Sequence, residues 1–139
     1  MALVSPDADA IGIEPFDGGR VIELTPVATR KYAYARRIID LADHPPAVPG
    51  QTRQLEVTAA FAARDLANSA QYQIRLKRLQ PTPAEVRPIW NDESILFDTV
   101  LQHTGRNVAI EPGEQGWNEI RATLEVPPDT RSLVISLGA

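Results

Sequence analysis

Apolar and polar residues alternate with a period of two in three stretches of this chain. The stretches are RQLEVTAAF at 53–61, QYQIRLKRL at 71–79 and EIRATLEV at 119–126. Successive side chains of a β-strand point to opposite faces, so this period predicts strands with one buried and one solvated face. The first two stretches are expected to be antiparallel neighbours. The side chains expected inside are Leu55, Val57, Ala59, Phe61, Tyr72, Ile74, Leu76, Ile120, Ala122, Leu124 and Val126.

Further short apolar segments bring the predicted count to about eight strands. They lie at 21–24, 95–104, 107–110 and 133–137, and both faces of the 95–104 segment carry apolar side chains, which predicts burial on both faces or a bulge. The proline-rich segment 80–94 is expected to be a loop. Many short strands separated by turns are typical of an all-β, antiparallel β-sandwich or barrel.

One segment, at 29–46, fits two periods. With a period of two, Tyr32, Tyr34 and Ile38 share a face, whereas a helical period places Tyr34, Ile38 and Leu41 on one stripe. Tyrosines and β-branched residues favour a strand, and alanines favour a helix. We expect the strand.

A length of 139 residues fits a single domain with its own core. Residues 1–17 lack a periodic signal and are expected to be a linker, with the sandwich domain at 18–139. There is no cysteine, which excludes disulfides and thiolate chemistry. We find no apolar run long enough to cross a bilayer and no signal-peptide pattern at the start, so no membrane contact is expected and the compartment stays open.

The formal net charge of −4 argues against a nucleic-acid partner, because such binders neutralise phosphates with a basic surface. The segment TRKYAYARR at 29–37 does interleave tyrosines with basic residues, a combination that can bind single strands. A solvated sheet face is the default interpretation. The same face could instead stack a sugar on tyrosine and bind its polar groups through arginine.

Short motifs in the second half of the chain resemble the jelly-roll modules of the galactose-binding-domain-like superfamily, which includes many carbohydrate-binding modules. The motifs are Pro49-Gly50 before an alternating strand, Gly116-Trp117 opening another, and Val126-Pro127 closing it. The resemblance covers about residues 18–139. It implies a jelly roll and a non-catalytic binding role, and it favours an extracytoplasmic location within a larger protein.

In such a sandwich the last two strands need not form a hairpin. The turn at Pro127-Pro128-Asp129 can pass the chain from one sheet to the other, so that the strand before it and the strand at 133–137 face each other across one core.

The candidate ligand-binding residues are aromatic side chains and their polar neighbours. Sugars stack on exposed aromatic rings, and Trp90 is expected in a loop beside Asn91 and Asp92, whose polar groups could hold hydroxyls. A packed anchor is an equal alternative for Trp90. The second candidate is the face that carries Tyr32 and Tyr34. Trp117 opens a core strand and is expected to serve the fold.

Catalysis and metal binding have little support in the sequence. The two histidines, His44 and His103, lie in no known catalytic motif, so no enzyme and no cofactor are expected. The pairs Asp7/Asp9 and Asp92/Glu93 could contribute to a structural calcium site, but neither is part of a full oxygen-ligand loop.

The outward positions of the alternating strands carry charges of both signs: Glu56, Arg75, Lys77, Arg121 and Glu125. This mixture weakens the carbohydrate hypothesis, because sugar-binding faces usually have fewer charges. Two hypotheses therefore remain: a non-catalytic module that binds a glycan or a protein, and a structural or protein-interaction domain without a small ligand.

Overall fold

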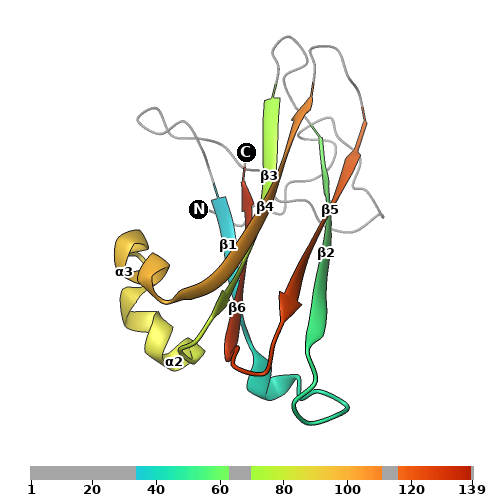
Figure 1. Cartoon of the computed structure of the whole chain (residues 1–139). Helices are drawn as coiled ribbons and strands as arrows, with labels where there is room; N and C mark the ends of the chain where they lie inside the picture. The colour runs from blue at the N-terminus through green and yellow to red at the C-terminus, as the bar shows by residue number, and fades with distance from the viewer. Residues whose placement is uncertain (1–33, 63–69, 111–115, 139) are drawn as a thin grey trace.

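The computed structural model describes residues 34–62, 70–110 and 116–138, and these form two antiparallel sheets (Figure 1). One sheet has the order β1-β6-β3-β4, and the other pairs β2 with β5. The expected linker, the segment at 21–24 and the pair Asp7/Asp9 lie outside the described residues. The strands are β1 (Tyr34–Asp40), β2 (Arg53–Phe61), β3 (Ala70–Leu79), β4 (Val100–Ile110), β5 (Asn118–Val126) and β6 (Ser132–Gly138).

The fold is therefore rich in antiparallel strands, as the alternation predicts. The described residues contain six strands, so the count of about eight stays a prediction. The ambiguous segment at 29–46 forms a strand over Tyr34–Asp40 and then a short 3-10 helix, η1 (Leu41–Asp43). The Asp40 side chain accepts a hydrogen bond of 2.9 Å from the Ala42 N–H at this transition.

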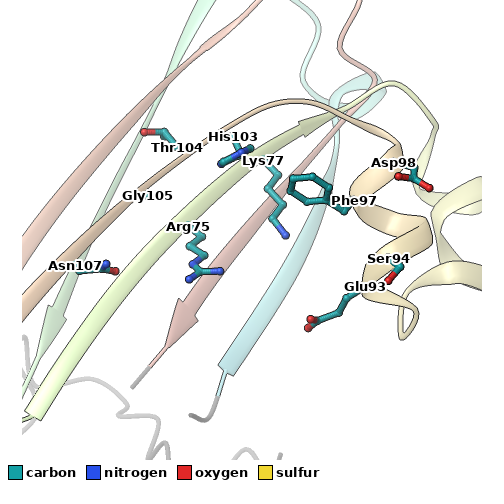
Figure 2. Close-up of a pocket in the computed structure, with 10 residues that line it drawn as sticks. All are labelled: Arg75, Lys77, Glu93, Ser94, Phe97, Asp98, His103, Thr104, Gly105 and Asn107. Carbon is teal, nitrogen blue, oxygen red and sulfur yellow. The ribbon is translucent and has the colours of Figure 1, made fainter. Parts of the chain in front are cut away.

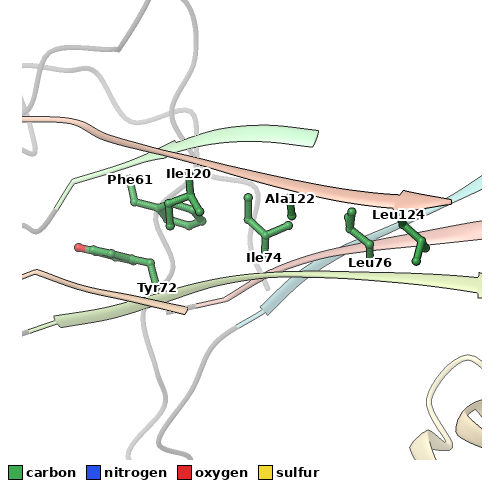
Figure 3. Close-up of a cluster of buried hydrophobic side chains, with 7 residues drawn as sticks. All are labelled: Phe61, Tyr72, Ile74, Leu76, Ile120, Ala122 and Leu124. Atoms are coloured by element: carbon green, nitrogen blue, oxygen red, sulfur yellow. The ribbon is translucent and has the colours of Figure 1, made fainter. Parts of the chain in front are cut away.

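The main hydrophobic core lies between the two sheets (Figure 3). Phe61 of β2 stacks on Tyr72 of β3, with ring centroids 4.8 Å apart. Leu55, Val57 and Ala59 are partly buried against this cluster. All the side chains expected inside thus face the core. Its buried members are Phe61, Tyr72, Ile74, Leu76, Ile120, Ala122 and Leu124.

The expected pairing of the first two alternating strands is wrong. β2 pairs along its whole length with β5, and β3 lies in the other sheet between β4 and β6. Alternation shows which face of a strand is buried, and it does not show which strand lies beside it. The expectation for the last two strands is confirmed, because β5 and β6 belong to different sheets whose inner faces meet.

The segment 80–98 differs from its prediction as a loop followed by a strand. It contains α2 (Pro83–Val86), the 3-10 helix η2 (Arg87–Ile89) and α3 (Glu93–Asp98). Pro83 occupies the first turn of α2, where its missing N–H costs nothing. The Asp92 carboxylate caps α3 by accepting a 3.1 Å bond from Ile95 N–H. The prolines that predicted a loop therefore help to start helices.

The helices cover part of the face of the four-stranded sheet that points away from β2 and β5, which we call the outer face (Figure 1). Val86 of α2 and Leu96 of α3 are buried against Leu79 of β3 and Val134 of β6. We call this second core the outer cluster. One end of the sheet is thus buried on both faces.

Candidate functional site

The strand register places basic side chains side by side on the outer face, beyond the helices. Arg36 of β1 and Arg75 of β3 both lie opposite Ser136 of β6, and Arg75 also lies opposite Gly105 of β4. Side chains two residues apart on a strand share a face, so Lys77 follows Arg75 on the same surface. This open part of the outer face is the candidate site.

A hollow of about 750 Å³ lies over the open part of β3 and β4 and is bounded by α3. Figure 2 shows Arg75, Lys77 and Phe97 projecting toward this space, with Glu93 reaching in from the helix and Asp98 directed away from it. The other lining residues are Ser94, His103, Thr104, Gly105 and Asn107.

Lys77 is the most electrostatically constrained group of the site. Partial burial lowers its pKa from the ordinary value, the Glu93 carboxylate acts in the opposite direction, and Arg75 and Arg36 lower the pKa further. The effects of burial and of the two arginines together outweigh that of the carboxylate. The open part of the outer face carries two cations of β3, Arg75 and Lys77, opposite two carboxylates of α3, Glu93 and Asp98, with Arg36 on the other side of β6.

The two cations that β3 contributes to the site have no bonded partner in the described part of the chain. Within the described residues, the Arg75 and Lys77 side chains form no hydrogen bond or salt bridge. Arg78, the next residue of the same strand, is fully engaged: it donates to Gln102 at 3.1 Å and to Asp129 at 3.0 Å. The fold thus supplies partners to one arginine of β3 and leaves the other available.

Trp90 lies in the short turn at 90–92 between η2 and α3, so the longer loop expected around it remains only as this turn. Its half-buried indole packs against the outer cluster, and the Arg36 guanidinium carbon lies 4.7 Å from the ring centroid. The indole therefore anchors the helices and holds Arg36 by a cation–π contact. Asn91 beside it is exposed, and Asp92 is used as the cap of α3.

Tyr34 lies on the outer face at the far end of the same surface, and Tyr32 lies outside the described residues. Tyr34 is 36 % exposed, and its hydroxyl accepts a 3.2 Å hydrogen bond from Nε2 of buried Gln73. Its ring lies against Gly138, where a Cβ would come within 2.7 Å of ring carbons. The structure therefore places Tyr34 and Trp90 on the same outer face. Arg36 follows Tyr34 on β1 and contacts the Trp90 ring.

Sequence reasoning missed the aromatic residue of the hollow. Phe97 was assigned to a strand, yet it lies on α3 with 54 % of its surface exposed, and its ring centroid is 5.7 Å from that of His103. The outward positions of Arg75 and Lys77 were identified, but their grouping with Arg36 depends on strand order, which the alternation does not show. Trp117, expected to serve the fold, is half-buried just before β5.

The described residues contain neither a group of metal ligands nor a helix that could span a membrane. Among the described residues, no three His, Asp or Glu side chains come together as a metal site would require, and Asp92 and Glu93 belong to the cap and first turn of α3. Within that part of the chain, no helix has the length and apolar character to cross a bilayer.

In comparisons with known proteins, no family model, no curated sequence and no solved structure matches this chain. The resemblance to galactose-binding-like modules therefore rests on its short motifs.

Proposed function

We propose that this chain is a non-catalytic binding module that takes a glycan in the hollow on the outer face. The hollow itself carries the proposal, because it combines an exposed aromatic ring with polar groups from two strands and a helix. Binding sites generally pair an apolar surface with a few polar groups that fix orientation.

Individual lining residues suit the chemistry of a sugar. The exposed Phe97 ring offers a surface for the C–H groups of a pyranose, and Asn107 and Ser94 can exchange hydrogen bonds with its hydroxyls. The hollow of about 750 Å³ has room for a short oligosaccharide. The candidate residues Tyr34 and Trp90 flank this surface, and Trp90 contributes by holding Arg36.

Binding is favoured over catalysis by the pattern of contacts. In the described part of the chain, no serine or threonine hydroxyl is hydrogen-bonded to a histidine, the contact that activates a nucleophile. The two facing sheets agree with a jelly roll, and we include that finer fold and a place within a larger extracytoplasmic protein in the proposal, as the resemblance implies.

A glycan array tests the proposal with variants of the hollow. Phe97→Ala and Asn107→Ala should lose the signal of the wild-type protein, and Thr123→Ala on the exposed face of β5 should keep it. If no glycan binds, or if the hollow variants bind as well as wild type, the proposal is wrong.

A protein partner is the second candidate. Three large apolar side chains of α3 and the start of β4, Ile95, Phe97 and Leu101, are exposed, as is common at protein interfaces. In that case Ile95→Ala would weaken capture of the partner, whereas it should leave glycan binding unchanged.

A further inference from the structure

We propose that the hollow selects acidic sugars and holds their carboxylate or sulfate group on Arg75 and Lys77, with Arg36 adding positive charge from the other side of β6. This inference rests on the proposed function and adds the class of glycan. Its starting point is charge: a chain with a formal net charge of −4 places Arg75 and Lys77 on the same face of β3, with Arg36 across β6 on the same open surface. Such a local excess of positive charge attracts anions against the overall balance.

Small residues leave the cations accessible from solvent. Ser136 separates Arg36 from Arg75 across the sheet, and Gly105 lies on the other side of Arg75. A Cβ added to Gly105 would lie 3.5 Å from the Arg75 Cγ, an ordinary van der Waals distance. The glycine therefore leaves the space of a methyl group open beside the Arg75 side chain. A guanidinium exposed in this way can bind both oxygens of a carboxylate.

The contacts of the three cations within the described residues leave them able to bind an anion. Arg36 is oriented by the Trp90 ring, a contact that leaves its N–H groups able to donate to a ligand. Arg75 and Lys77 have no hydrogen bond or salt bridge among the described residues. The lowered pKa of Lys77 agrees with this arrangement, because a bound anion would offset the burial and the two neighbouring arginines.

Glu93 gives the inference a distinctive consequence. Its carboxylate reaches into the hollow from α3 and acts on Lys77 (Figure 2). A bound acidic group would be repelled by Glu93 while it gains from the cations. Removing this carboxylate should therefore strengthen binding of an acidic sugar and should leave binding of a neutral sugar unchanged.

The test is calorimetric titration with two matched pairs of polymers. Polygalacturonate is compared with its methyl ester, and dextran sulfate with dextran, so that the two members of each pair share one sugar backbone and only one of them is charged. We expect the wild-type protein to bind at least one charged polymer and to bind its neutral form at least tenfold more weakly, since hydrogen bonds to charged groups are stronger than those between neutral groups. The arm that responds identifies carboxylate or sulfate as the group recognised.

Variants localise the effect to the hollow. Arg75→Gln and Lys77→Gln should each weaken binding of the charged polymer about tenfold or more, and Glu93→Gln should tighten it. Arg121→Gln is the matched control, because it removes the same charge from an exposed position on β5. The Arg121 side chain forms only a long, exposed ion pair of 3.8 Å with Glu56, so this variant should have little effect on polymer binding.

The outcomes separate this inference from the proposed function. Equal binding of charged and neutral polymers overturns the acidic selectivity and leaves a glycan module in place. Equal loss in Arg121→Gln and Arg75→Gln shows general electrostatic attraction and overturns the site. Failure of all four polymers together with an empty glycan array overturns both proposals.

Discussion

The two ends of the outer face differ although the same strands form them. At one end, Leu79 and Val134 are buried beneath α2 and α3. Two residues earlier on β3, Lys77 is only partly covered, and Arg75 is exposed beside a hollow. The covered end has the apolar side chains that a packed surface requires, whereas the open end has Arg75 and Lys77, which form no hydrogen bond or salt bridge among the described residues.

This difference teaches where to seek function in a β-rich domain. Solvated sheet faces usually mix charges whose contacts contribute little, as Arg121 and Glu56 do on the two-stranded sheet at 3.8 Å. The open end places Arg36, Arg75 and Lys77 on one surface of the sheet, opposite Glu93 and Asp98 of α3, and packing does not account for the basic side chains of β3. The proposed anionic ligand would account for them.

The largest expected effect concerns the covered end. Leu96 is 2 % exposed within the outer cluster, so Leu96→Ala should lower the free energy of unfolding by about 2–5 kcal/mol. Urea denaturation measures this change. Its neighbour Phe97 is 54 % exposed, and Phe97→Ala should cost far less stability while abolishing glycan binding. If Phe97→Ala were the more destabilising variant, the division into covered and open ends would be wrong.

A smaller effect is expected at the boundary between the two ends. Trp90 is half-buried against the outer cluster, so Trp90→Ala should lower the free energy of unfolding by about 1–3 kcal/mol, less than for a fully buried indole. It should also weaken acidic-ligand binding by releasing Arg36. Trp90→Phe keeps an aromatic ring, so it should recover part of the lost stability and part of the lost acidic-ligand binding. A variant of full stability that has lost binding would make Trp90 a direct ligand contact.

At the open end, removing a cation should hardly change stability. Lys77→Met relieves a partly buried charge, so the free energy of unfolding at pH 7 should stay within about 0.5 kcal/mol of wild type or rise slightly. A loss of 2 kcal/mol or more, of the size expected for a broken buried pair, would show that Lys77 is structural.

The pH dependence of the free energy of unfolding, compared between wild type and Lys77→Met, tests the direction of the Lys77 pKa shift. The folded pKa of Lys77 lies below the ordinary value of 10.5, so between these two values the unfolded chain binds more protons. The stability of wild type relative to Lys77→Met should therefore increase as pH rises through this window. Burial raises the pKa of Tyr72, which lowers stability above pH 10, but it does so in both proteins and cancels in the difference.

The smallest expected effect is at the start of α2. Hydrogen bonds from the Thr82 N–H and hydroxyl to the Glu85 carboxylate lower the pKa of Glu85 below its ordinary value of 4.5. Its contribution to stability is present above that value and is lost as pH falls through the lower folded pKa. Glu85→Gln should thus flatten the acid limb of a stability–pH curve slightly, whereas an unchanged limb would show that the bonds contribute nothing.

The sequence predicts the core between the sheets better than it predicts the outer cluster. Ile74, Leu76, Ile120 and Leu124 follow a period of two that only a half-buried strand produces, and all four are buried. Helices of four and six residues are too short to show a helical period. Their signals, a proline in the first turn and an aspartate cap, are also those of loops.

The candidate site was partly predictable for a related reason. Alternation alone predicts outward positions for Arg75 and Lys77, and a solvated face for the strand that carries Tyr34. Their meeting on one surface depends on β6 lying between β1 and β3, a long-range pairing that the alternating pattern leaves open. Phe97 joins them only because α3 forms.

The most direct test of the account is a map of ligand contacts by ¹H–¹⁵N NMR titration with short fragments of the two charged polymers, trigalacturonate and sulfated isomaltotriose. The account predicts the largest shift changes at the amides of Arg75, Lys77, Gly105 and Phe97, with Glu56 and Arg121 on the two-stranded sheet unchanged. Shift changes centred on the two-stranded sheet, or a spectrum with no change at millimolar ligand, would contradict the assignment of an acidic-sugar site to the open end of the outer face.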